Sequence, residues 1–130
     1  MNLVVDTHPL VWYLAGEDRR LSRRARATFA DVEAGRATLH VPAPVLMELV
    51  LLEQLGRVRG PYAELRVQLG LRAGIRLEPL LPEDVDEARA LAVLQDPFDR
   101  MIVGTAIRLG LPLLTRDAEI TTSRRVKTVW

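Results

Sequence analysis

Short apolar runs alternate with longer helical patterns along the chain, and this alternation constrains the fold more than any other feature of the sequence. The apolar runs, which we expect to form strands, span residues 2–5, 37–41, 75–78, 112–115 and 126–129. Strands that alternate with helices are typical of a parallel sheet, because a helix returns the chain to the starting edge before the next strand. The sequence therefore predicts an α/β fold with a mainly parallel sheet of about five strands.

Capping residues, prolines and glycines mark the ends of the expected helices. Ser22 and Asp96 are residue types that cap helix N-termini, and proline suits the first turn of a helix. Glycine is typical of the position after the last turn. These signals predict helices over residues 9–15, 22–35, 44–56, 61–71, 82–94 and 96–110.

Length and composition favour a single folded domain over residues 1–130. A chain of 130 residues can bury a substantial core but is short for two domains, and its 48% hydrophobic fraction argues against disorder. The sequence has no run of the ~18 apolar residues that a membrane span needs and no signal-peptide pattern, so we expect a cytoplasmic protein without a membrane partner. The absence of cysteine excludes disulfides, thiolate catalysis and Cys-type zinc sites.

The basic residues are nearly all arginine. All but Lys127 of the 18 cationic residues are Arg, although the formal net charge is only +1. The densest cluster, "RRLSRRAR" at residues 19–26, has two explanations that the sequence leaves open. It forms either a solvated helix face or a rim that contacts RNA phosphates, for which a planar guanidinium fork is suited.

Two acidic residues follow expected strands. Asp6 comes directly after "NLVV", and Asp117 comes after "PLLT" and one arginine. In an open parallel sheet, ligands bind beyond the carboxyl ends of the strands, where the strand order reverses. If these two strands are neighbours at that point, the two carboxylates converge. Each acid also has a structural alternative, because Asp6 can cap the helix that contains Pro9 and Asp117 can cap a short turn.

Two further acids lie on apolar helix faces. Asp99 heads a line of residues that should face inward, Ile102, Val103 and Ala106. Glu48 has the apolar helical neighbours Val45, Leu51, Leu52 and Leu55. An unpaired carboxylate on such a face is costly, so Glu48 needs a partner such as arginine or a metal ion. Glu53, by contrast, has Arg57 four residues later and is expected to form an exposed ion pair.

A divalent metal site accounts for these acids together. Capping roles leave Glu48 unexplained, and acids that cluster without a cation repel one another. Oxygen ligands suit Mg²⁺ or Mn²⁺, which activate water and neutralise charge on a phosphoryl group. The predicted catalytic and metal-binding residues are Asp6, Glu48, Asp99 and Asp117.

Three other residues near these motifs are weaker candidates. Asp96 is expected to cap its helix, and Asp99 has the alternative of joining it in a capping pair. His8 could reach the same cleft, although packing or capping is the favoured role. Glu119 is a candidate contact of a second metal ion.

The motifs of this chain resemble those of PIN-domain ribonucleases, and among them the VapC-type toxins of bacterial toxin–antitoxin pairs. The segments that carry the resemblance are "VVDTHPLVWYL", "PVLMELVLLEQL", "DPFDRMIVGTAIRLGLPLLTRD" and "VKTVW". The first and third are quite specific in combination, because "DTHxLxW", "DPFDR" and "TRD" occur in the family's order and approximate spacing. "PVLMEL" departs from the family, in which relatives often have a more polar approach with Ser and Trp.

The resemblance implies a three-layer α/β/α domain that cleaves RNA phosphodiesters with Mg²⁺ or Mn²⁺. It also implies a homodimer and inhibition by a cognate antitoxin, for which we expect an apolar antitoxin helix along Trp12 and Tyr13. The family's motifs place the metal-binding acids at Asp6, Glu48, Asp99 and Asp117, the same four residues, and Asp96 also matches a family position. A non-catalytic RNA- or protein-binding domain of this fold, or a housekeeping nuclease without an antitoxin, is the alternative.

Two other function classes fit less well. A phosphoacceptor signalling domain needs an Asp at the end of a central strand, and "IRLEP" offers none. A haloacid-dehalogenase-like phosphatase needs an Asp two residues after Asp6, where this chain has His8. The sequence therefore favours a metal-dependent nuclease over both.

Overall fold

The computed structural model describes residues 1–130 and contains one five-stranded parallel sheet. The strands are β1 (Asn2–Val5), β2 (Thr38–Pro42), β3 (Ile75–Glu78), β4 (Leu113–Leu114) and β5 (Thr128–Val129). Their order in the sheet is β3-β2-β1-β4-β5. From β1 the chain builds the sheet first toward β3 and then, on the other side, toward β5. The strand order therefore reverses between β1 and β4.

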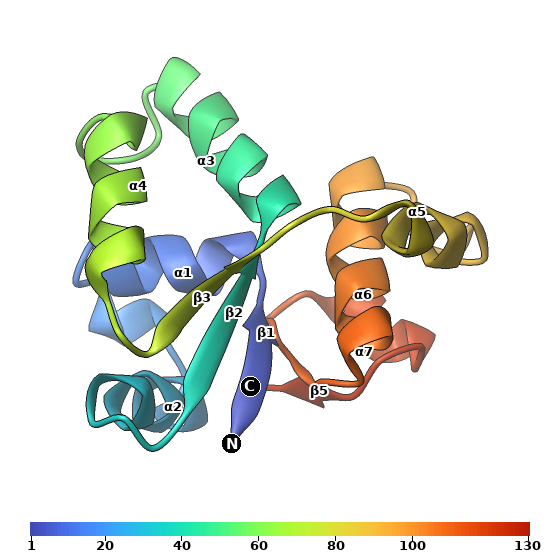
Figure 1. The fold of residues 1–130 in the computed structure, drawn as a ribbon, viewed down its shortest axis with the longest axis horizontal. Helices are drawn as coiled ribbons and strands as arrows, with labels where there is room; N and C mark the ends of the chain where they lie inside the picture. The colour runs from blue at the N-terminus through green and yellow to red at the C-terminus, as the bar shows by residue number, and fades with distance from the viewer.

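Seven α-helices cover the two faces of the sheet and make three layers (Figure 1). On one side lie α1 (Thr7–Leu14), α2 (Arg23–Glu33), α3 (Ala43–Gln54) and α4 (Tyr62–Leu71). On the other side lie α5 (Pro82–Arg89), α6 (Pro97–Leu109) and α7 (Ala118–Ser123). A short 3₁₀ helix, η1 (Asp18–Arg20), joins α1 to α2. The predicted α/β/α fold is confirmed, and none of these helices has the length and apolar character required to cross a bilayer.

The predicted elements occur in the predicted order, with differences at their ends. β1 and β3 have the expected bounds, whereas β4 and β5 are only two residues long. The helix expected over residues 82–94 ends at Arg89, because the chain then turns to bury Leu91 and Leu94. Arg100 stabilises this turn by donating to the carbonyl of Leu94. Neither η1 nor a complete helix at α7 was expected.

The predicted capping signals operate at the helix ends. The Ser22 hydroxyl accepts a hydrogen bond from the backbone N–H of Ala25 at 3.0 Å, at the start of α2. Asp96 caps α6 by accepting from the N–H of Phe98 at 2.7 Å. Gly110 ends α6 in the left-handed conformation, with φ at 65°, which a side chain would disfavour.

The core lies on both faces of the central strands. Residues 3–5 of β1 are fully buried, as expected for a strand that helices cover on both sides. Phe29 and Val32 line the inner face of α2. The line of residues behind Asp99 on α6 is fully buried, as predicted, at Ile102, Val103 and Ala106.

Helix α6 is held against α5 by a close backbone contact and a buried ion pair. Gly104 lies so near α5 that a Cβ atom on it would be 2.5 Å from the backbone oxygen of Asp84. The Asp84 carboxylate is fully buried, pairs with the guanidinium of Arg108, and accepts from the N–H of Leu81 at 2.9 Å. These contacts position the helix that carries Asp99.

Candidate metal centre

A pocket opens where the carboxyl ends of β1 and β4 meet. Val5 pairs with Leu114 in the sheet, and the backbone N–H of Asp6 donates to the Leu114 carbonyl at 3.0 Å. Asp6 is thus the first residue beyond β1, and it is 6% exposed. The pocket has a volume of about 400 Å³, and its walls carry five carboxylates, those of Asp6, Glu48, Asp96, Asp99 and Asp117.

Two threonines hold the Asp6 carboxylate. The backbone N–H of Thr7 donates to Oδ1 at 2.8 Å, and the hydroxyl of Thr115 donates to Oδ2 at 2.6 Å. The Thr115 hydroxyl also accepts from the backbone N–H of Asp117 at 3.0 Å. One hydroxyl therefore links the two acids that follow β1 and β4. Asp6 is also the N-cap residue of α1, so its capping role and its place in the pocket coexist.

Glu48 reaches the same pocket from the middle of α3. Its Oε1 accepts a hydrogen bond from the hydroxyl of Thr7 at 2.6 Å, so the first residue of α1 contacts both Asp6 and Glu48. The apolar surroundings are less buried than expected, because Leu55 is 64% exposed. No arginine, lysine or histidine forms an ion pair with Glu48.

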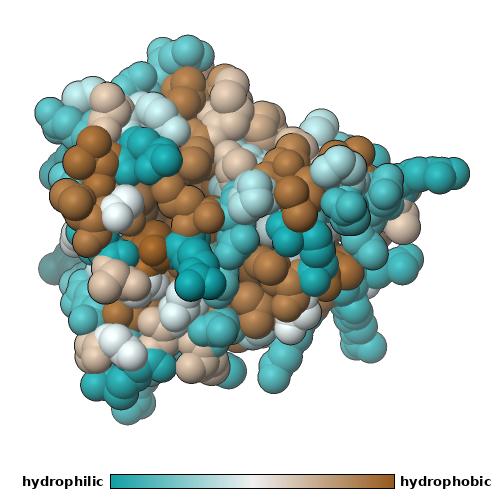
Figure 2. Space-filling view, in the orientation of Figure 1, coloured by the Kyte–Doolittle hydropathy of each residue, from teal (hydrophilic) through white to brown (hydrophobic).

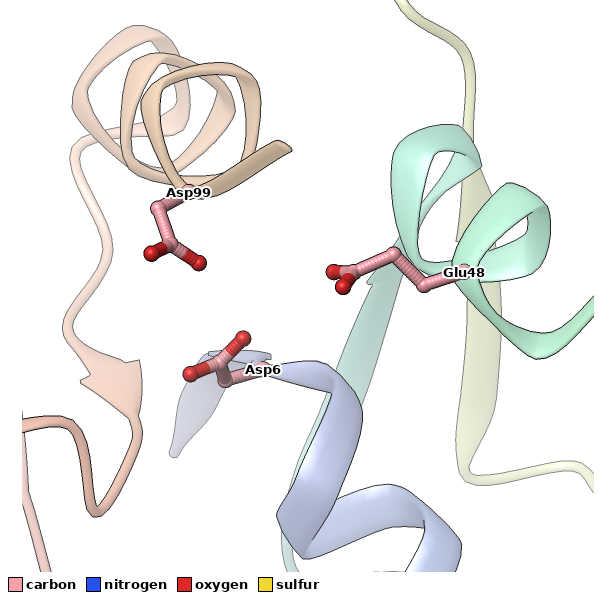
Figure 3. A group of neighbouring side chains, drawn as sticks. All are labelled: Asp6, Glu48 and Asp99. Atoms are coloured by element: carbon pink, nitrogen blue, oxygen red, sulfur yellow. The ribbon is translucent and has the colours of Figure 1, made fainter. Parts of the chain in front are cut away.

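Asp99 enters the pocket from the other side of the sheet, on the first turn of α6. Its backbone N–H donates weakly to Asp96 at 3.4 Å, which completes the cap of the helix. The Asp99 carboxylate itself makes no hydrogen bond or ion pair with the protein, so the capping pair considered for it does not form. Figure 3 shows this carboxylate facing Asp6 and Glu48.

The structure brings together three of the four predicted acids. Carboxylate oxygens of Asp6, Glu48 and Asp99 lie within 4.8 Å of one another (Figure 3). They come from the end of β1, from α3 and from α6 (Figure 3). None of the three forms an ion pair with an arginine, lysine or histidine. A set of oxygen donors with this much uncompensated negative charge fits Mg²⁺ or Mn²⁺. Their role as metal ligands stays a prediction.

Burial raises the pKa values of all three acids, and neighbouring carboxylates add to the rise. Burial raises the pKa of Asp6, against the opposing effect of its hydrogen bonds from Thr115 and Thr7. Burial likewise raises the pKa of Glu48, and the Asp6 charge adds to it. The pKa of Asp99 rises from 3.8 to about 7, first through burial and then through the surrounding carboxylates. A nearby cation would favour the ionised forms of all three.

Asp117 lines the pocket but stands outside the three-acid group. Its Oδ1 accepts from the backbone N–H of Ile120 at 2.8 Å, which makes it the N-cap of α7. The structural alternative considered for this residue is therefore present. Its negative charge still contributes to the raised pKa of Asp99. A direct contact of Asp117 with a metal ion stays a prediction.

The remaining acidic candidates lie elsewhere. Glu119 is exposed on α7 and lines a different hollow on the surface. The residue of α7 that is buried is its neighbour Ile120. The structure therefore does not bring Glu119 to the pocket. The expected ion pair between Glu53 and Arg57 is wrong, since the Glu53 carboxylate instead accepts from the backbone N–H of Tyr62 at the start of α4.

The aromatic residues of α1 are packed against other rings. Trp12 is 8% exposed, and its ring lies 6.1 Å from that of Trp130. Tyr13 stacks on Phe29 at 4.1 Å, and burial followed by its hydrogen bond to Glu33 raises its pKa to about 12. These contacts leave little ring surface for the antitoxin helix expected there. His8 is exposed, lines the pocket, and lies 5.8 Å from the Trp12 ring.

The sequence analysis missed the two threonines that hold the acids. Thr7 directly follows Asp6, and Thr115 ends the apolar run before Asp117. A hydroxyl residue beside an acid at a strand end is the signal that would have identified them, because a carboxylate in a partly buried site needs donors.

The sequence match to a known family spans this whole arrangement. Residues 3–125 match the sequence profile of the PIN domain. The chain belongs to the PIN domain family. The match includes every acid of the pocket, so the resemblance in the motifs is confirmed. Among curated protein sequences, none matches this PIN domain significantly.

Solved structures share the fold of this PIN domain over nearly its full length. A VapBC complex of Salmonella typhimurium bound to DNA is 16% identical, with a TM-score of 0.71 and coverage of 99% of this chain and 97% of that one. The VapBC2 complex of Rickettsia felis, bound to a promoter DNA fragment, is 12% identical, with a TM-score of 0.70 and coverage of 99% of this chain and 98% of that one. The sarcin-ricin loop cleaving toxin VapC20 of Mycobacterium tuberculosis is 18% identical, with a TM-score of 0.63 and coverage of 94% of this chain and 95% of that one. At these identities the likeness establishes the fold.

Proposed function

We propose that this PIN domain, residues 1–130 as one unit, is a metal-dependent endoribonuclease that hydrolyses RNA phosphodiester bonds. The observation that carries the proposal is the convergence of Asp6, Glu48 and Asp99 within 4.8 Å without a side-chain cation. In this proposal these acids and Asp117 hold Mg²⁺ or Mn²⁺. Such an ion neutralises charge on a phosphoryl group and lowers the pKa of water.

The protein's own groups prepare the acids for a cation. The hydroxyls of Thr7 and Thr115 each donate one hydrogen bond, to Glu48 and Asp6, which orients these carboxylates and leaves acceptor lone pairs free. Asp99 accepts no hydrogen bond, so its whole carboxylate is available. Because its pKa is about 7, binding of a cation near neutral pH displaces a proton from Asp99, and metal affinity should rise with pH.

We propose further that the protein is the toxin of a toxin–antitoxin pair and acts in the cytoplasm. Support comes from the solved structures of the same fold, which include VapBC complexes and a toxin that cleaves the sarcin-ricin loop. A small open reading frame immediately upstream, whose product co-purifies with this chain, would favour the toxin over a housekeeping nuclease. A chain that purifies alone from its native host would favour the housekeeping nuclease.

The antitoxin site that we propose is an apolar groove between α1, α3 and α4, in place of the packed Trp12 and Tyr13 surface. The groove has a volume of about 330 Å³ and takes Val11 and Leu14 from α1 and Leu65 from α4. Arginines also line it, at Arg57 and Arg59. An antitoxin helix with apolar side chains and flanking acids would match both features, and Leu14→Asp should weaken its binding.

We also propose a homodimer that covers exposed apolar surface on α3 and α4. Figure 2 shows apolar residues gathered over these helices, and Met47, Val67 and Leu71 are 47%, 60% and 80% exposed. Contiguous apolar surface of this kind marks protein contacts. Analytical ultracentrifugation should find a dimer for the wild type and a monomer for Leu71→Asp. A monomeric wild type would contradict the proposal.

RNA cleavage by antitoxin-free protein tests the proposed activity. We expect cleavage of structured RNA with Mg²⁺ or Mn²⁺ and none in EDTA. Asp99→Asn should cleave RNA about 100-fold more slowly or worse, as expected when a metal ligand is removed. Asp86→Asn, which removes an exposed acid of α5 outside the pocket, is the matched control and should cleave like the wild type. Cleavage in EDTA, or full activity of Asp99→Asn, would contradict the proposal.

A further inference from the structure

One arginine lies at the rim of the acid pocket and makes no hydrogen bond or ion pair within the protein. Arg116 is the only Arg or Lys that lines the pocket. It is exposed and forms no ion pair. Its guanidinium carbon lies 5.8 Å from the centroid of the Trp12 ring, which lines the same pocket. The ring contact holds the side chain in place while its five N–H donors stay free.

A second arginine reaches the same ring from another part of the chain. Arg20, the last residue of η1, places its guanidinium carbon 5.5 Å from the centroid of Trp12. Its only ion pair, with Glu17 at 3.4 Å, is solvent-exposed, and such pairs contribute little to stability. Because Trp12 is buried and packed on Trp130, it is a rigid support for both cations. Two positive charges over one ring favour an anion beside them.

The arginine cluster at residues 19–26 therefore divides by role. Arg26 has a structural role, since it donates to the carbonyls of Asp18 and Leu21 at 3.1 and 2.9 Å and stabilises the end of η1. Arg20 is the member that packs on Trp12. The sequence left open whether the cluster is a solvated helix face or a phosphate contact, and the structure shows that its arginines do not share one role.

The pocket needs positive charge at its rim if it is to receive RNA. Five carboxylates line it against one arginine, so it repels a phosphodiester chain. A divalent ion held by the acids would compensate part of this charge at the cleaved phosphate. Guanidinium groups beside the pocket would compensate it for the neighbouring part of the strand, because their planar forks match phosphate oxygens.

We propose that Arg116 and Arg20, supported by Trp12, bind the RNA backbone phosphate next to the one that is cleaved. The inference rests on the proposed RNA cleavage and adds substrate-positioning residues to it. Three observations carry it: the free donors of Arg116, its place on the pocket rim, and the Trp12 ring that it shares with Arg20.

Steady-state kinetics with an RNA hairpin that the wild type cleaves is the first test. Arg116→Gln and Arg20→Gln should each raise KM on the order of tenfold and change kcat by less than about twofold, as expected for one lost charged hydrogen bond in binding. Arg66→Gln, which changes an exposed arginine of α4 outside the pocket, is the matched control and should leave KM unchanged. Arg116→Lys should recover part of the affinity.

The salt dependence of RNA binding is the second test. Fluorescence anisotropy with the same hairpin in the Asp99→Asn background separates binding from cleavage. Removing one phosphate contact should reduce the slope of log K against log salt by about 0.7, which loss of a purely structural residue would not do. Arg116→Lys should retain the slope because it keeps the charge.

The outcomes separate this inference from the proposed activity. Unchanged KM and salt slope in both Gln variants, with metal-dependent cleavage by the wild type, overturn the inference and leave the nuclease intact. If the wild type cleaves no RNA, the proposed activity is wrong and the inference falls with it. If RNA binding is unchanged but binding of a polyglutamate peptide falls, the two arginines serve an acidic protein partner and the inference is wrong.

Discussion

Replacing Asp99 by asparagine should stabilise the metal-free protein at neutral and alkaline pH. The pKa of Asp99 is about 7 rather than 3.8, because the side chain is partly buried and faces other carboxylates. A pKa that is higher in the folded state means that stability falls as pH rises from about 4 to about 7, since the unfolded chain releases the proton first. Asparagine has a similar shape without the charge, so Asp99→Asn should not show this loss.

The size of the gain follows from the pKa and the exposure of the site. The interval from 3.8 to about 7 corresponds to an upper limit of ~4 kcal/mol, at ~1.4 kcal/mol for each tenfold change in proton affinity. Solvent screens a half-buried side chain and reduces this to about 1–2 kcal/mol. The dipole of α6 favours a negative charge in the first turn by about 0.3–1 kcal/mol. We therefore expect a net gain of about 1 kcal/mol at pH 8 and a smaller one at pH 5.

Urea unfolding of antitoxin-free wild type, Asp99→Asn and the control Asp86→Asn measures the effect, in EDTA at both pH values. Metal at ~100 times its dissociation constant should stabilise the wild type by about 2.7 kcal/mol and Asp99→Asn much less. If Asp99→Asn is less stable than the wild type in EDTA at pH 8 and keeps its response to metal, the reasoning is refuted. Asp99 would then be a structural residue of the α6 terminus.

Three further changes test the contacts that position the site. Gly104→Ala should lower the free energy of unfolding in urea by about 2 kcal/mol, because its Cβ would lie 2.5 Å from the Asp84 backbone oxygen. An unchanged unfolding midpoint would mean that α5 moves to accommodate the methyl group. Arg108→Ala should cost about 3 kcal/mol in thermal unfolding, because it leaves the buried Asp84 carboxylate without its ion-pair partner; an unchanged stability would contradict this. Thr115→Val removes the donor to Asp6 and should raise the Asp6 pKa further, which NMR titration of its carboxyl carbon measures; a lowered pKa would contradict this account.

Local sequence determined the elements of this protein and the face on which some acids lie. Ser22, Asp96 and Gly110 mark helix ends because capping involves groups only a few residues apart. The apolar line behind Asp99 predicted its inward position, because the period of a helix alone decides which residues share a face. The alternation of strands and helices likewise predicted a parallel sheet, and the motifs indicated the family before the profile match confirmed it.

Only the tertiary structure decided which side chains meet. The sequence left Asp117 with two roles, a helix cap and a member of the acid cluster; the structure shows the cap and places Asp117 outside the three-acid group. The sequence assigned Glu53 to an arginine one turn away, but the start of α4 offers a backbone donor instead. The contacts of Arg20 and Arg116 with Trp12 could not be predicted from the sequence either, because they depend on how η1 and β4 pack around α1. Contacts between residues far apart in the chain depend on the placement of whole elements, which local propensities do not specify.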